Sequence, residues 1–114
     1  MASTTASKKA KGRRHQGWVR DELLKRFPTL EADDIRSTSM GAGGEDLQLS
    51  PAARKLIPYS FECKSLAKFA GYKFMEQAES NTPKGAQPIA VVKANRKKPL
   101  VLIDAEYFFN LLLE

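Results

Sequence analysis

The chain has 114 residues, which suits one domain with a single modest core. Hydrophobic residues make up 42% of it, a fraction that excludes a wholly disordered protein. The formal net charge of +6 points to an anionic partner, and nucleic acid is the commonest partner of a soluble basic domain. A basic surface that serves only solubility is the alternative.

Two residue types limit the chemistry further. Cys63 is the only cysteine, so an intrachain disulfide is excluded and a reducing compartment is expected. His15 is the only histidine, which excludes a cysteine–histidine zinc set and leaves no firmly held base for a nucleophilic thiol. No apolar run reaches the roughly 18–20 residues of a membrane span, and the N-terminus does not resemble a secretory signal.

Residues 1–16 are rich in Ala, Ser, Thr, Lys and Arg and lack apolar periodicity. This composition predicts a disordered basic tail before a single domain at residues 17–114. The tail could lie along phosphates as a flexible arm or serve only as a solubilising segment, and the sequence favours neither. The phosphate contacts of such an arm would be Lys8, Lys9, Lys11, Arg13 and Arg14.

Residues 18–27 predict a helix, because apolar side chains recur at helical spacing and Pro28 follows. Glu22 lies beside the apolar stripe of this helix. It could reach an active site, but an ion pair with Arg26, four residues later, is the more ordinary arrangement.

Two short strands are predicted at residues 34–38 and 45–49, joined by a glycine-rich turn. Glycines allow a ligand to approach the backbone closely, but the Gly-Lys-Ser/Thr ending of a phosphate-binding P-loop is absent. Alternation along the second strand places Leu47 in a core and Asp46 on the opposite face.

Residues 59–64 predict a third strand, after an exposed loop at residues 50–55. The period-two pattern fixes Glu62 and Lys64 on one face of this strand, opposite its apolar residues. Antiparallel pairing of the second and third strands would bring Asp46 and Glu62 together on that face.

The remaining elements are a helix at residues 66–80, buried strands at 88–94 and 100–103, and a helix at 104–114. Asp104 can cap the last helix, whose apolar side chains cover more than one face. That helix should either sink into the fold or pack on another subunit. The order α-β-β-β-α-β-β-α predicts an α/β (mixed α+β) domain with a central mixed sheet flanked by helices.

Two carboxylates near a lysine are the parts that metal-dependent phosphodiester hydrolysis requires. Asp46 and Glu62 could hold Mg²⁺, with Mn²⁺ as a substitute, because hard cations prefer oxygen ligands. The backbone carbonyl of Cys63 could add a further oxygen, and Lys64 could orient the attacking water and stabilise charge on phosphorus. The alternative is that Glu62 and Lys64 form an ordinary pair on an exposed sheet face.

The residues Gly44-Glu45-Asp46, Phe61-Glu62-Cys63-Lys64 and Gln77-Ala78 form a pattern that resembles the PD-(D/E)xK nuclease superfamily. Within residues 17–104 the chain is most similar to small Holliday-junction resolvases and phage-type endonucleases. The resemblance implies a restriction-endonuclease-like core with Asp46 and Glu62 as metal ligands, Lys64 as the catalytic lysine and Gln77 near the site.

The resemblance leaves two ligand positions open. Glu22 is the best match to an acidic residue that family members add from the first helix, although Asp21 is adjacent. Glu45 stands where many members have a proline, and it could replace Asp46 as the ligand, but alternation with Leu47 favours Asp46.

The expected activity is that of a Mg²⁺-dependent DNA endonuclease acting on branched DNA as a homodimer, with one active site for each of two strands. The alternatives are a non-catalytic nucleic-acid-binding module and a nicking or single-strand nuclease. A cytoplasmic protein of phage or prokaryotic origin fits the resemblance. Further phosphate contacts are expected from Arg54, Lys55, Lys93, Arg96, Lys97 and Lys98.

Overall fold

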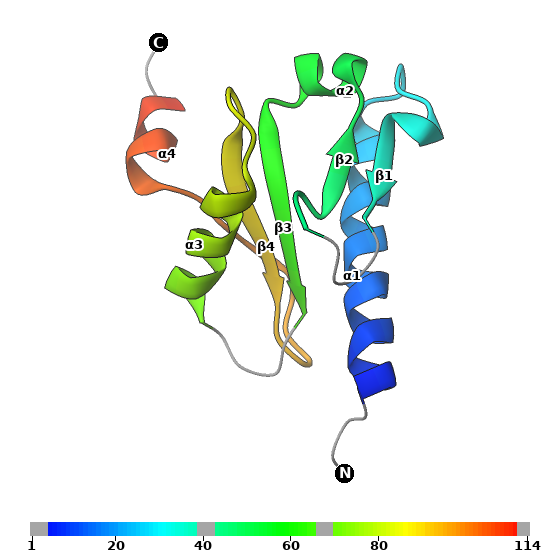
Figure 1. Cartoon of the computed structure of the whole chain (residues 1–114), viewed down its shortest axis with the longest axis vertical. Coiled ribbons are helices and arrows are strands. Elements are labelled where there is room, and N and C mark those ends of the chain that lie inside the picture. Colours follow the sequence, from blue (N-terminus) through cyan, green and yellow to red (C-terminus); the bar gives the residue numbers. More distant parts are fainter. Residues whose placement is uncertain (1–4, 39–42, 66–69, 112–114) are drawn as a thin grey trace.

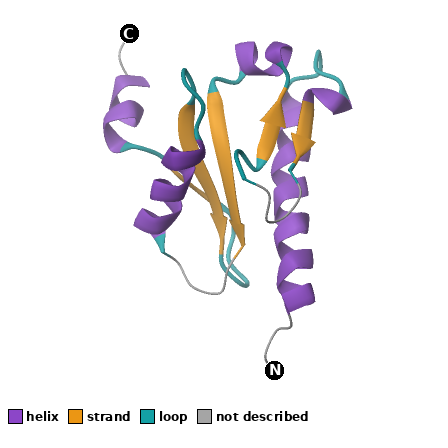
Figure 2. Ribbon diagram, in the orientation of Figure 1, coloured by secondary structure: helices purple, strands orange, loops and turns teal. Residues whose placement is uncertain are grey.

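The computed structural model describes residues 5–38, 43–65 and 70–111, and it has a mixed α+β architecture (Figure 1, Figure 2). The helices are α1 (Thr5–Arg26), α2 (Pro51–Leu56), α3 (Gly71–Asn81) and α4 (Ala105–Leu111), with a short 3₁₀ helix at Ala32–Asp34. The strands are β1 (Ile35–Ser37), β2 (Leu47–Leu49), β3 (Tyr59–Ser65), β4 (Gln87–Lys93) and β5 (Leu100–Leu102). The expected mixed α+β class is confirmed, but two sheets take the place of the single central sheet that was expected.

The described strands form two sheets. β1 and β2 pair antiparallel, with Ile35 opposite Leu49. β3 and β4 pair in parallel, with Glu62 opposite Ala90, and β5 adds antiparallel to β4. The expected hairpin between the second and third strands is wrong, because α3 returns the chain so that β3 takes β4 as its ladder partner.

The core lies on both faces of the β3–β4 pair. On one face Val19 of α1 packs with Phe61 and Val91, and on the other Phe74 of α3 packs with Ala90. This double cover explains the nearly continuous apolar run of β4. Successive side chains of a strand point to opposite faces. Phe61 points toward α1, so Glu62, the next residue, points toward α3.

The N-terminal segment differs most from its prediction. Residues 5–16 belong to α1 and are not a disordered tail, while residues 1–4 lie outside the described part. His15 and Gln16, at 5% and 4% exposure, extend the buried stripe of Val19 toward the N-terminus. This part of the helix was not predicted from the sequence because His15 and Gln16 are polar, so the apolar pattern starts only about one turn later, at Trp18 and Val19.

A second difference lies between β2 and β3, where the expected loop at residues 50–55 is the helix α2. Ser50 is its N-cap: the Ser50 hydroxyl accepts a hydrogen bond from the Ala53 N–H at 3.1 Å, and Pro51 occupies the first turn. Ser followed by Pro is a recognised helix start, so the sequence did contain this signal.

The C-terminal elements are more exposed than expected. Leu100 and Val101 of β5 are 54% and 55% exposed, so this strand is not buried. The Asp104 carboxylate accepts a hydrogen bond from the Tyr107 N–H at 2.8 Å, which confirms the predicted cap of α4. The helix buries none of its described residues, so it does not sink into the fold, and residues 112–114 lie outside the description.

Leu47 should be the residue of β2 on which stability depends most, because its side chain is fully buried in the core shared with α1. We expect Leu47→Ala to lower the free energy of unfolding by about 2–5 kcal/mol. Urea denaturation followed by circular dichroism measures this loss. Gln48→Ala, at the exposed neighbouring position, is the matched control and should change the free energy of unfolding by less than about 0.5 kcal/mol. Equal effects of the two substitutions would contradict this description of the core.

Candidate active site

Asp46 meets β3 through its side chain. It directly precedes β2, and its Oδ2 accepts a hydrogen bond of 2.7 Å from the backbone N–H of Cys63. β3 is the edge strand of its sheet, and this bond lies on the edge that does not pair with β4. β2 itself pairs with β1, so no backbone ladder joins β2 to β3. Asp46 and Glu62 are therefore brought together as expected, but by a side-chain bond to the strand edge and not by a hairpin.

The backbone around Asp46 is fixed from two sides. The Gln16 amide of α1 donates to the carbonyl oxygens of Asp46 at 2.7 Å and Thr38 at 2.9 Å, and the Thr38 N–H donates to the Asp46 carbonyl at 2.8 Å. Gln16 thus joins the long helix to the site. Nothing in a basic, polar N-terminal segment marks one glutamine as buried, so sequence reasoning missed it.

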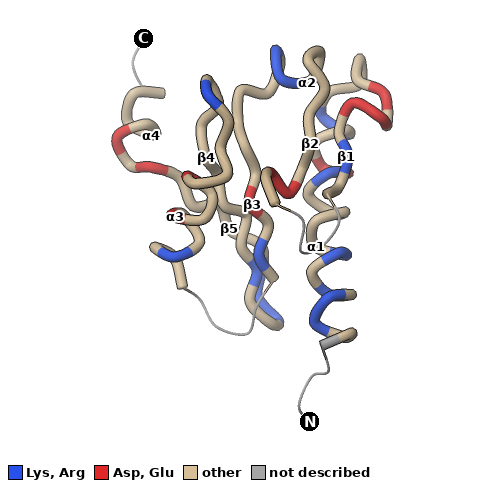
Figure 3. Tube along the Cα trace, viewed as in Figure 1, with Lys and Arg blue, Asp and Glu red and all other residues tan. Residues whose placement is uncertain are grey.

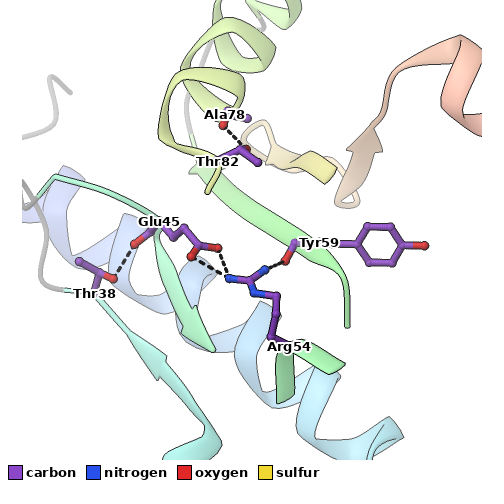
Figure 4. Close-up of polar contacts among 6 residues, drawn as sticks. All are labelled: Thr38, Glu45, Arg54, Tyr59, Ala78 and Thr82. Atoms are coloured by element: carbon purple, nitrogen blue, oxygen red, sulfur yellow. Dashed lines mark hydrogen bonds and ion pairs between the residues drawn. The ribbon is translucent and has the colours of Figure 1, made fainter. Parts of the chain in front are cut away.

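Glu45 is held by α2 and not by the site. Both of its carboxylate oxygens accept bonds of 2.7 Å from Arg54, whose guanidinium also donates to the Tyr59 carbonyl, while the Thr38 hydroxyl donates to the Glu45 carbonyl at 2.6 Å (Figure 4). The choice of Asp46 over Glu45 as the site carboxylate is thereby supported. Arg54, expected to contact phosphate, is instead engaged in this clamp.

Glu62 is the most buried charged residue of the site, at 2% exposure. Its Oε1 lies 3.2 Å from the Lys64 ammonium, while its Oε2 is buried and has no hydrogen-bond partner among the described residues. An ordinary pair on an exposed sheet face would leave both oxygens in water, so that alternative is wrong. A buried carboxylate oxygen without a partner is costly unless a ligand satisfies it.

Burial raises the pKa of Asp46, although the Cys63 N–H and the Lys64 charge oppose the shift. Burial also raises the pKa of Glu62, the nearby Asp46 charge adds to this, and Lys64 opposes it. Burial therefore disfavours the charged form of both carboxylates, and their mutual repulsion adds to this cost at Glu62. A divalent cation between them would supply the compensating positive charge.

Cys63 contributes its backbone and not its thiol. Burial, followed by the charges of Asp46 and Glu62, raises the pKa of the Cys63 thiol far above its usual range, so the thiol stays protonated and is a poor nucleophile. The N–H and C=O of a strand residue point toward the same edge, so the Cys63 carbonyl lies at the edge that faces Asp46. This placement suits its expected role as an oxygen ligand.

The helix α3 places a different amide near Glu62 than expected. Gln77 is exposed, and its backbone carbonyl accepts a hydrogen bond of 3.0 Å from the Ser80 hydroxyl. Asn81, one helical turn later, interacts with the Glu62 side chain and partly opposes the rise in the Glu62 pKa that burial and Asp46 cause. The spacing i to i+4 puts both amides on one stripe, and that spacing is the signal that could have pointed to Asn81.

The acidic residues of α1 do not join this cluster. Glu22 pairs with Lys25 at 2.7 Å and Arg26 at 3.2 Å, which confirms the ion-pair interpretation, and Asp21 pairs with Arg20 at 3.4 Å. Glu22 also borders a pocket with Phe61, on the face of β3 opposite Glu62. Neither residue is positioned to bind a metal beside Glu62.

The donor set for a cation is small. Within residues 5–38, 43–65 and 70–111, no three His, Cys, Asp or Glu side chains come close enough to form a metal cluster. Asp46, Glu62 and the Cys63 carbonyl supply oxygen atoms only, which suits Mg²⁺, a cation that keeps several waters. Glu62 Oε2, which has no partner among the described residues, and the raised pKa of both carboxylates fit such an ion.

Lysine and arginine residues gather along the N-terminal half of α1 and at the turn between β4 and β5, at the same end of the molecule (Figure 3). Lys11 links the two segments, since its ammonium donates to the Asn95 side chain at 2.9 Å. The exposed members of this group are Lys8, Lys9, Arg13, Arg14, Arg96, Lys97 and Lys98. Lys93 is half-buried beside them, while Lys55 lies exposed on α2.

Comparison of the chain with protein-family models, with curated proteins and with solved structures found no match. No helix of the described residues combines the length and apolar character needed to cross a membrane.

The Gln16 side chain should contribute to the stability of the fold because it holds the backbone at Asp46. We expect Gln16→Ala to lower the free energy of unfolding by about 1–3 kcal/mol, because it removes the donor to two carbonyl groups at a buried contact. Urea denaturation checks the loss. Lys9→Ala, an exposed position on the same helix, is the control and should leave the midpoint nearly unchanged. A neutral Gln16→Ala would show that this amide does not hold the Asp46 backbone.

Proposed function

We propose that this protein is a metal-dependent endodeoxyribonuclease of the PD-(D/E)xK type that hydrolyses phosphodiester bonds of branched DNA. The observation that carries the proposal is the buried cluster of Asp46, Glu62 and Lys64, in which Glu62 Oε2 has no partner among the described residues. The order α1-β1-β2-α2-β3-α3-β4, with β3 and β4 parallel, supports the restriction-endonuclease-like core that the resemblance implies, with α2 as an addition between β2 and β3.

In this proposal Asp46, Glu62 and the Cys63 carbonyl hold Mg²⁺, and Mn²⁺ can replace it. When bound, such an ion would supply Lewis-acid chemistry at the scissile phosphate and would lower the pKa of the attacking water. Lys64 orients that water and stabilises the negative charge that develops on the phosphate oxygens. Gln77 and Asn81 lie on one stripe of α3, and the Asn81 amide adds a polar group beside Glu62. The basic end of α1 and the β4–β5 turn bind the flanking phosphates.

A homodimer suits a substrate with two strands to cut, and α4 offers a surface for it. Phe108, Phe109 and Leu111 are 46%, 63% and 53% exposed on this helix, an arrangement typical of an interface. The partner is a second copy of the chain. Sedimentation of the wild-type protein and of Phe109→Asp tests this: a dimer that the substitution converts to a monomer supports the interface, and a wild-type monomer would exclude it.

The function is tested by incubating the protein with a labelled four-way junction and with a linear duplex of the same sequence, with and without Mg²⁺. Cleavage of the junction that requires Mg²⁺ supports the proposal. Binding without cleavage of any DNA would favour the non-catalytic module. Equal cleavage of duplex and junction would remove only the preference for branched DNA, and cuts confined to one strand or to single-stranded DNA would favour a nicking or single-strand nuclease.

A further inference from the structure

We propose that the pocket between α1 and the β4–β5 turn binds an unpaired nucleotide of the DNA strand, with its base against Trp18 and its phosphates on the surrounding cations. The pocket has a volume of about 640 Å³, within the range of sites that hold a nucleotide-sized ligand. Its lining includes Lys11, Arg14, His15, Trp18, Lys93 and Arg96. The inference rests on the proposed nuclease function in one respect: that function identifies the nucleic acid as DNA.

The charge of the pocket selects an anion. Among the described residues that line it, four are cationic and none is a carboxylate. Within the described residues, none of the four forms an ion pair, whereas Arg20, Arg26 and Arg54 elsewhere all do. Cations that are gathered without counter-charges repel one another, and a phosphate chain relieves this repulsion.

The aromatic pair supplies a platform for a base. Trp18 is 45% exposed, while His15 beside it is buried, with ring planes 12° apart and centroids 6.3 Å apart. His15 Nε2 lies 3.0 Å from the Val91 carbonyl, which can only accept, so this nitrogen carries the proton and anchors the ring to β4. An indole that a fixed neighbour supports is a pre-ordered surface on which a base can stack.

The turn that carries Arg96 points to ligand binding as well. Arg96 has a φ of 61°, a left-handed conformation that a glycine or asparagine would adopt more readily, and the Lys97 N–H closes the turn on the Ala94 carbonyl at 3.2 Å. An arginine at such a position gives up backbone stability. Its side chain lines the pocket, where a guanidinium can hold a phosphate or stack on a base.

The pocket also lies where a strand leaving the acidic cluster would pass. Ser65, which ends β3, lines the pocket, and it directly follows Lys64. Lys93, at the end of the parallel strand β4, pairs in register with Ser65. A base inside a duplex is stacked and cannot enter a pocket, so the bound nucleotide must be unpaired, as nucleotides at a branch point can be.

Trp18 is the only tryptophan of the chain, so its fluorescence reports on the pocket directly. The full-length protein is titrated in EDTA with a short oligothymidylate, an abasic strand of equal length, a blunt duplex and thymidine monophosphate. We expect the oligothymidylate to quench Trp18 and to bind about 10- to 100-fold more tightly than the abasic strand, because stacking contributes that much per base. Equal affinity of the two strands, or no quenching, would overturn the base pocket. Mononucleotide binding as tight as that of the oligothymidylate would overturn the assignment to a strand.

Variants are compared by the anisotropy of a labelled oligothymidylate. Trp18→Leu should weaken binding, while Trp18→Phe, which keeps a ring, should restore most of it. Arg96→Gly removes a cation and relieves the positive φ, so binding should weaken with no loss of thermal stability, and the salt dependence should fall by about 0.7 in slope. Lys84→Gln removes an exposed charge elsewhere and is the control. If Trp18→Leu or Arg96→Gly bound like wild type, the pocket would not be the site.

The pocket and the nuclease can fail separately. Mg²⁺-dependent cleavage without quenching of Trp18 by DNA would refute the pocket and leave the nuclease in place. Quenching by single-stranded DNA without cleavage of any substrate would refute the nuclease and leave a nucleic-acid-binding site.

Discussion

Glu62→Gln is expected to lower the rate of DNA cleavage in Mg²⁺ by about 10³-fold or more. The amide keeps the size of the carboxylate but removes the charge that a cation requires, and metal assistance contributes several kcal/mol to such a reaction. Single-turnover cleavage of a labelled four-way junction measures the loss. Glu79→Gln, an exposed position on α3, is the matched control and should cleave normally. A fully active Glu62→Gln would mean that the site lies elsewhere.

The same substitution should stabilise the metal-free protein at neutral pH, by roughly 0.5–2 kcal/mol. The pKa of Glu62 and the pKa of Asp46 are both raised in the folded state, so ionising these groups costs stability. Stability is then highest below their unfolded pKa values of about 4 and falls as pH rises through the folded values. Thermal melts across pH should show this decline in wild type and a smaller one in Glu62→Gln, and Mg²⁺ should raise the melting temperature of wild type alone. A wild-type melting temperature that rises from pH 4 to pH 7 without metal would contradict the predicted direction of the change in stability.

Lys64→Ala is expected to lower the cleavage rate by about 10²–10³-fold while DNA binding stays within a few-fold of wild type. The Lys64 ammonium is partly buried beside Glu62, so it acts at the reacting phosphate and adds little to long-range attraction. Anisotropy measures binding, and single-turnover cleavage measures the rate. Lys73→Ala, exposed on α3, removes the same charge away from the site and should cleave normally.

The outcome that would count against this role is a parallel loss of binding and rate in Lys64→Ala. Lys64 would then be a phosphate contact of the kind expected at Lys97 and Lys98. A loss of rate with an unchanged binding constant places the lost interaction in the transition state.

Local patterns in the sequence were sufficient to predict the strands β3 and β4 and the faces to which their side chains point. Strand alternation in residues 59–64 placed Glu62 and Lys64 on one face, and the apolar run of β4 indicated burial on both sides. These features depend on period and hydrophobicity, which are properties of neighbouring residues. The order of elements could be predicted for the same reason, apart from α2, whose Ser50-Pro51 start was taken for a loop.

Features that depend on distant partners could not be predicted in this way. The pairing of β3 with β4, and not with β2, follows from how α3 packs, and the contact of Asp46 with the Cys63 N–H follows from that arrangement. Gln16 and His15 are buried because carbonyl groups of Asp46 and Val91 lie opposite them, and no local pattern carries that information. Asn81 was passed over for Gln77 because the register of α3 against Glu62 is likewise set by packing.

The hydrogen bond from the Cys63 N–H to Asp46 makes one peptide group a native spectroscopic reporter of the site. This amide donates its hydrogen bond to the Asp46 carboxylate, so the chemical shift of the amide proton and its exchange with solvent depend on the state of Asp46. Protonation, cation binding or displacement of the β2 segment would each alter this single resonance. The electrostatic state of the acidic cluster can therefore be followed in the unlabelled, substrate-free protein from the backbone of a residue whose own side chain takes no part.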